Sequence, residues 1–210
     1  FPAGCPILIA GTGQSNGNGW GLTSAYTSNA NVKDWSTPSN SPPRSGPPFP
    51  AQSARAWRTP NTDTDIAKND YVGIENYIGY KEGNIGNINI SMANYIANAS
   101  GRTVYVVQVN RDGADARYWN PTGAGGFNTG VTLVAEITAA LATTEITTWN
   151  SANPNDQITA PDVLNIMQGE SDAGGLAGRS VSPKIWADTW LDYIKNSSST
   201  YFKENHTRVI

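Results

Sequence analysis

The sequence has 210 residues, of which 15% are charged, and its formal net charge at pH 7 is −3. A chain of this length is expected to form one domain, residues 1–210, with a sizeable core. The absence of a basic cluster argues against a nucleic-acid partner. Since no run of 18 apolar residues occurs, no membrane span or membrane partner is expected.

The first predicted element is a buried strand over residues 7–10, where four apolar residues precede a glycine-rich turn, GTGQSNG, at 11–17. Glycine accepts a positive φ at little steric cost, so we expect a tight turn there. The turn carries Ser15 beyond the carboxyl end of the strand, where ligands bind in an open α/β sheet. Ser15 is therefore a candidate nucleophile, although Gly, Ser and Asn also form ordinary surface loops.

Two known motifs compete for this turn. A dinucleotide fingerprint is rejected, because Asn16 stands in place of the third glycine and we find no acidic residue about 20 residues on, at the end of a second strand. Residues 13–17 do fit Gly-x-Ser-x-Gly, the nucleophile elbow of α/β-hydrolases. That elbow follows several strands, whereas only one precedes Ser15, so the α/β-hydrolase fold is not expected.

Residues 18–70 are predicted to form a long irregular insertion, because seven prolines lie there among Ser, Asn, Gly and Thr. A long structureless insertion in a compact domain is either functional or disordered. Since it follows Ser15, we expect it to wall the site, with Trp20, Trp35 and Trp57 as anchors.

The rest of the chain alternates helices and strands: a helix at 85–99, a strand at 103–109, a helix at 131–142, a strand at 161–167, a helix at 183–196 and a strand at 207–210. The first helix has a predicted apolar face of Ile88, Met92, Tyr95, Ile96 and Ala99, and Gly101 stands where a left-handed cap is expected. This alternation predicts an α/β fold with a parallel sheet and helices on both faces.

Three polar turns follow the strands, and they carry Ser15, Gly113 and Gln168. In a parallel sheet these turns lie along one edge. A serine, a backbone N–H at a glycine and a side-chain amide are the groups that acyl transfer needs, namely a nucleophile and donors for an oxyanion. Alternatively, Gln168, Glu170 and Asp172 only cap a turn and the next helix.

These motifs resemble those of the SGNH hydrolase (GDSL-like lipase and esterase) superfamily, in its branch of carbohydrate acetylesterases and sialate O-acetylesterases. The resemblance rests on GQSN at 13–16, on the glycine block from Gly113 to Trp119, and on QGESD at 168–172. It implies a three-layer α/β/α sandwich with a central parallel sheet, of SGNH or flavodoxin-like type. It also implies that Ser15 is the nucleophile and that the N–H groups of Ser15 and Gly113 and the amide of Gln168 form the oxyanion hole.

Two further roles follow from the same resemblance, with Glu170 holding the turns and Asn16 bracing the first of them. The family takes its catalytic Asp and His from an Asp-x-x-His block. Here Lys203 stands three residues before His206, the one histidine, so the pattern fails. His206 also precedes the last strand, and we expect it at the sheet edge opposite Ser15. We therefore expect the domain to continue beyond Ile210 with the missing Asp-x-x-His.

The sequence thus predicts a serine esterase that removes O-acetyl groups from a carbohydrate, located outside the cell or on a virion surface. No cofactor, metal or nucleotide is expected, because no Cys/His cluster and no phosphate loop occur. The single cysteine, Cys5, excludes an internal disulfide and is expected to be a small buried hydrophobe. The alternatives are a catalytically inactive glycan-binding domain or one module of a phage tail or surface protein, which would then form a homo-oligomer.

Overall fold

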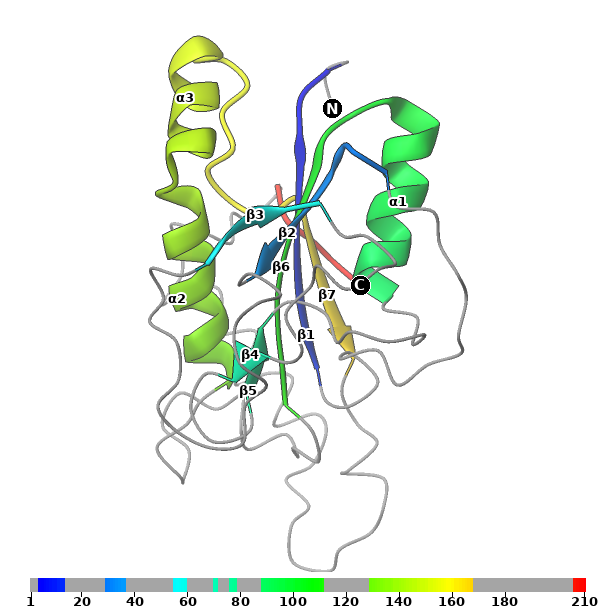
Figure 1. Ribbon diagram of the computed structural model, residues 1–210, viewed down its shortest axis with the longest axis vertical. Helices are drawn as coiled ribbons and strands as arrows, with labels where there is room; N and C mark the ends of the chain where they lie inside the picture. Colours follow the sequence, from blue (N-terminus) through cyan, green and yellow to red (C-terminus); the bar gives the residue numbers. More distant parts are fainter. Residues whose placement is uncertain are drawn as a thin grey trace, which may run out of the picture.

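The computed structural model describes residues 4–13, 29–36, 55–59, 70–71, 76–78, 88–111, 129–167 and 206–210 (Figure 1). In chain order the elements are β1 (Ile7–Gly13), β2 (Val32–Ser36), β3 (Ala56–Arg58), β4 (Asp70–Tyr71), β5 (Asn76–Ile78), α1 (Ile88–Ser100), β6 (Val104–Arg111), α2 (Thr129–Leu141), α3 (Thr144–Ala152), β7 (Val163–Met167) and β8 (Arg208–Val209). No helix among these residues is long and apolar enough to cross a membrane.

The strands form one mixed sheet in the order β3-β2-β6-β1-β7-β8, and β5 joins β6 while pairing with β4. Neighbours from β2 to β8 run parallel, whereas β3 and β5 pair antiparallel with β2 and β6. The expected α/β fold is confirmed, but the expectation of a purely parallel sheet is wrong at these two added strands.

The prediction that residues 18–70 lack regular structure is also wrong for β2 and β3. β2 pairs in parallel with the start of β6, and β3 pairs with β2. Trp35 is 3% exposed, and its ring centroid lies 5.2 Å from that of Trp57. These long-range contacts stabilise two strands in a segment whose prolines argue against strand structure. They also anchor part of the insertion to the core. Trp20 lies outside the described residues.

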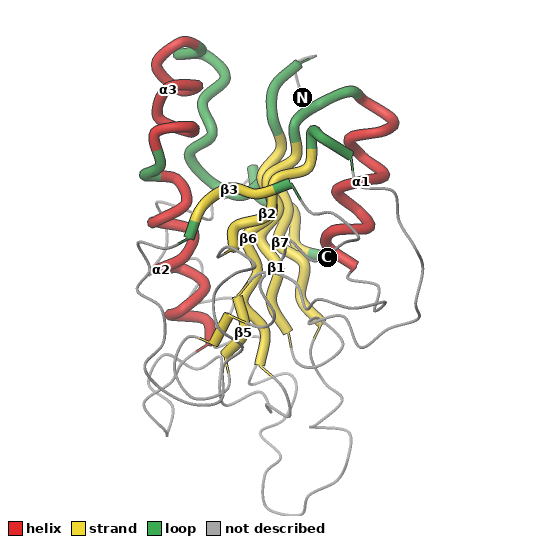
Figure 2. The backbone as a smooth tube through the Cα atoms, viewed as in Figure 1, coloured by secondary structure: helices red, strands yellow, loops and turns green. Residues whose placement is uncertain are grey.

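Helices cover both faces of the sheet, with α1 and α2 on opposite sides of the strands (Figure 2). Successive side chains of a strand point to opposite faces, so β1 serves both sides. Ile7 and Ile9 pack with α1, whereas Leu8 and Ala10 belong to the cluster that includes Leu133 of α2. Packing on both faces of the sheet thus holds the central strands in place, and with them the carboxyl ends of these strands.

The predicted apolar face of α1 is wrong in part. Met92 and Ile96 are partly buried against the core, as expected, but Ile88 is 46% and Tyr95 76% exposed and Ala99 is also exposed. The fully buried positions of the helix are Asn89, Ile90, Ala93, Asn94 and Ala97. Burial of an amide is tolerated when it is hydrogen-bonded, and both asparagines are bonded, Asn94 to the carbonyl of Ile90 at 3.0 Å. Gly101 caps the helix at φ +68°, as expected.

A buried ion pair ties the other face together. On α2, Glu136 accepts hydrogen bonds from the Trp35 indole at 2.8 Å and from Arg55 Nη1 at 3.0 Å. The periodicity predicts Thr138 on the buried face of this helix, but Thr138 is exposed and Glu136 is buried. A glutamate in a helix is ordinarily predicted to be exposed, because its charge must be paired before it can be buried. Its partner Arg55 is 81 residues away in the sequence, so the local pattern does not reveal the pair.

The remaining elements compare with the prediction in three ways. The strands near 103–109, 161–167 and 207–210 correspond to β6, β7 and β8. Helix α3 was not predicted, because its short stretch of Thr and Asn carries little apolar periodicity. The helix predicted at 183–196 lies outside the described residues.

Candidate functional site

The ends of three parallel strands meet at one edge of the sheet. Gly13, the last residue of β1, has Asn110 of β6 as its register partner on one side and Met167 of β7 on the other. Ser15, Gly113 and Gln168 lie outside the described residues, but each follows one of these three strand ends within three residues. The predicted convergence therefore holds for the points from which the three segments start.

Two glycines of β1 let neighbouring groups approach closely at this edge, a strand at Gly13 and a helix side chain at Gly11. A Cβ at Gly13 would lie 2.1 Å from the carbonyl oxygen of Met167, and a Cβ at Gly11 would lie 2.2 Å from Nδ2 of Asn89. Both glycines belong to β1, so the prediction of a strand that ends at Ala10 with a turn from Gly11 is wrong. The room that these positions leave for neighbouring groups explains why they carry no side chain.

A chain of buried polar side chains crosses the sheet on its α1 face. Asn165 donates to Oδ1 of Asn89 at 2.9 Å, Asn89 donates to Oε1 of Gln108 at 3.0 Å, and Gln108 donates to Asp34 at 3.4 Å. We call these four residues the amide row. Sequence reasoning missed them, although one signal was present, because Gln108 and Asn165 each interrupt an otherwise apolar strand.

Asp34 corrects one step of the sequence argument. It lies in β2, about 20 residues after the glycine turn, where the dinucleotide motif expects an acidic residue. Yet β2 pairs with β6 and not with β1, and the carboxylate is buried within the amide row. The missing third glycine still argues against that motif, and the position of β2 now adds to the argument.

Asn110 occupies the last position of this face before the edge. It is fully buried, and neither Nδ2 nor Oδ1 has a hydrogen-bond partner among the described residues. Each buried polar group without a partner costs stability and calls for an explanation. Asn110 differs in this respect from the buried amides of the amide row, which are all hydrogen-bonded.

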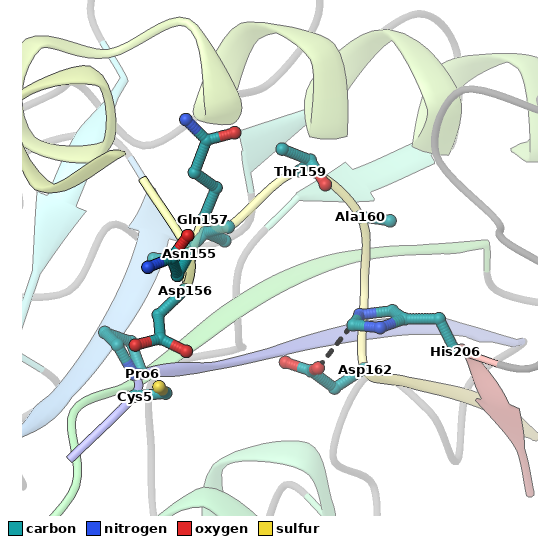
Figure 3. A pocket seen from close by; sticks show the side chains of 10 residues that line it. Cys5, Pro6, Asn155, Asp156, Gln157, Thr159, Ala160, Asp162 and His206 are labelled. Carbon is teal, nitrogen blue, oxygen red and sulfur yellow. Dashed lines mark ion pairs between the residues drawn. The ribbon is translucent and has the colours of Figure 1, made fainter. Parts of the chain in front are cut away.

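The opposite, amino-terminal edge holds the one histidine. His206 Nε2 lies 3.0 Å from Oδ1 of Asp162 (Figure 3). The other carboxylate oxygen, Oδ2 of Asp162, accepts the backbone N–H of Leu8 at 2.8 Å. Burial raises the pKa of the Asp162 carboxyl, against the opposing effects of the Leu8 bond and of His206. Asp162 precedes β7, so the length of this strand, about 16 Å at 3.3 Å per residue, separates the pair from Met167. His206 therefore lies at the edge where we expected it.

A cavity of about 370 Å³ adjoins this pair (Figure 3). It is lined by Cys5 and Pro6, by residues 155–160, and by Asp162 and His206. Cys5 is half-buried rather than fully buried, and burial and a hydrogen bond with Asp156 raise the pKa of its thiol. Within the described part of the chain no cluster of His, Cys, Asp and Glu could hold a metal ion.

Comparison with known proteins yields a similar fold. No family model matches the sequence, and no curated protein matches it. A crystal structure of a protein from Arabidopsis thaliana is similar with a TM-score of 0.54 and 13% sequence identity, over 92% of this chain and 70% of that one. At this identity the likeness concerns the fold alone.

Proposed function

We propose that the protein is a serine esterase of the SGNH hydrolase superfamily, with a three-layer α/β/α sandwich, that removes O-acetyl groups from a carbohydrate. The observation that carries the proposal is the register of Gly13 between Asn110 and Met167. It brings together the strand ends from which the segments with the proposed nucleophile and the proposed oxyanion donors start. The proposed location of the protein is outside the cell or on a virion surface.

In the proposed reaction Ser15 Oγ attacks the acetyl carbonyl carbon, and a general base takes its proton. The oxyanion accepts hydrogen bonds from the N–H groups of Ser15 and Gly113 and from the Gln168 amide. The ester bond breaks, the protonated base returns the proton to the sugar oxygen, and water hydrolyses the acyl-enzyme to release acetate. His206 is not assigned this role, because it pairs with Asp162 at the opposite edge.

Acetate release tests the proposal. The protein is incubated with an O-acetylated polysaccharide, and free acetate is measured for the wild type and for Ser15→Ala. Ser151→Ala is the matched control, because Ser151 is exposed on α3 and bonds only locally to Thr147. We expect Ser15→Ala to abolish release and Ser151→Ala to retain it; equal release by wild type and Ser15→Ala would reject Ser15 as the nucleophile.

The position of His206 favours a second candidate function, a glycan-binding domain without catalysis. In this alternative the same sheet edge binds the acetylated carbohydrate but no base activates Ser15. Calorimetric titration with the intact polysaccharide separates the two, because the binding domain gives saturable heat with no acetate, whereas the esterase converts the ligand during the titration.

A further inference from the structure

We propose that Asn89 is a positioning residue of the proposed esterase site. Its amide joins the strands on either side of β1 just before they end, and so it sets the spacing of the strand ends that precede Ser15, Gly113 and Gln168 in the sequence. This inference rests on the proposed function, and it extends that function to a residue of α1 that has no sequence motif.

The contacts of Asn89 are directed to both sides of β1. Its Oδ1 accepts from Asn165 of β7 at 2.9 Å, and its Nδ2 donates to Gln108 of β6 at 3.0 Å. Asn165 and Gln108 are the two register partners of Gly11. Since Gly11 has no Cβ, the Asn89 amide fills the space above it and spans from one neighbour strand to the other.

Asn89 contacts both neighbour strands at the level of Gly11. One level toward the amino end, Ile9 and its register partners Val106 and Val163 are all apolar. Non-directional packing is enough to hold the strands there. At the level of Gly11 the apolar pattern is replaced by amides.

The amides are costly unless their geometry is satisfied. Asn89, Gln108 and Asn165 are 2%, 0% and 6% exposed, and buried amides need their hydrogen bonds. A directional network fixes strand spacing more narrowly than apolar contacts do. The network lies at the level of Gly11, two residues before Gly13. A displacement of the strands by about 1 Å at this level would pass directly to the proposed site, and such a displacement can lower the rate about 100-fold.

The test compares Asn89→Leu with Asn94→Leu. Asn94 is a matched control, because it is a buried asparagine of the same helix, bonded to Ile90 and to the N–H of Asn29 away from the strand ends. We measure kcat and KM for acetate release and the thermal midpoint of each variant. Asn89→Leu should lower kcat about 10- to 100-fold with KM within about twofold. Asn94→Leu should lower the midpoint but keep kcat within about twofold.

A second variant guards against misfolding. Gly11→Ala leaves Asn89 in place but puts a methyl group where its Nδ2 lies. The end of that side chain can move, so the protein should fold with the amide displaced. We expect it to lower kcat in the same way as Asn89→Leu. An unchanged kcat in both variants, or an equal loss in Asn94→Leu, would overturn the inference.

Hydrogen exchange separates this inference from the proposed function. In Asn89→Leu the backbone N–H groups of residues 11–13 should exchange at least about tenfold faster, and those of residues 7–9 should change less. Faster exchange in a protein that releases no acetate would leave the positioning intact and reject the esterase. Unchanged exchange and unchanged kcat in an active enzyme would reject the positioning alone.

Discussion

Gly13 offers a direct way to disturb the sheet edge without touching a proposed catalytic group. In Gly13→Ala the new Cβ would lie 2.1 Å from the Met167 carbonyl oxygen and 3.0 Å from the Met167 Cβ. An ordinary carbon–oxygen contact is about 3.3 Å or longer, so β1 and β7 must separate by about 1 Å. The obstacle is backbone, which cannot rotate away as a side chain could.

The expected cost has two parts. Overpacking of this kind destabilises by about 1–3 kcal/mol, which lowers the thermal midpoint of a chain of this size by about 2–4 °C per kcal/mol. A shift of about 1 Å between Gly13 and Met167 also moves the segments that start beyond them, and we expect acetate release to fall about 100-fold.

Gly101→Ala is the matched control for Gly13→Ala. Gly101 has φ +68° and no atom within 4 Å of a built Cβ, so alanine adds backbone strain of about 1–2 kcal/mol but no collision. It lies before β6, at the other end of the sheet. Thermal melts and acetate release should show a similar midpoint loss in both variants but a large rate loss only in Gly13→Ala. A wild-type rate in folded Gly13→Ala would refute the reasoning from strand spacing.

Three further predictions concern stability. Glu136→Leu should destabilise by about 3–5 kcal/mol in urea unfolding, because it leaves the Arg55 guanidinium buried without its partner, and adding Arg55→Leu should restore part of the loss. Burial and the bond to Glu145 raise the pKa of the Tyr105 hydroxyl. The neutral hydroxyl therefore contributes its full share to the free energy of unfolding below about pH 10, and this share is lost as the pH rises further. In Tyr105→Phe the free energy of unfolding, measured in urea, should depend less steeply on pH above about pH 10. Asn110→Leu should raise the thermal midpoint, because it removes a buried amide without a described partner, and a lower midpoint would contradict this explanation.

The sequence predicts the strands that have continuous apolar content and fails where long-range contacts decide. β6 and β7 were found because their Val, Ile and Leu residues satisfy a local criterion. β2 and β3 were missed, because their stability comes from pairing with β6 and from Trp35 and Trp57. No local pattern carries that information.

The prediction of the buried face of α1 was wrong in part for a related reason. Counting Asn89 and Asn94 as polar surface residues rotates the predicted face toward Ile88 and Tyr95. The partners that permit burial of these asparagines lie on other elements. For the candidate site, the strand order and the positions of Gly and polar residues predicted the convergence of strand ends, while the amide row needed the register.

The most direct test of the central claim is the reaction of the protein with a serine-directed fluorophosphonate, followed by intact mass and peptide sequencing. We expect one adduct, on Ser15 in the tryptic peptide that ends at Lys33, and no adduct in Ser15→Ala. An unmodified Ser15 in folded protein, or the same adduct in Ser15→Ala, would contradict the claim that this sheet edge carries an activated serine.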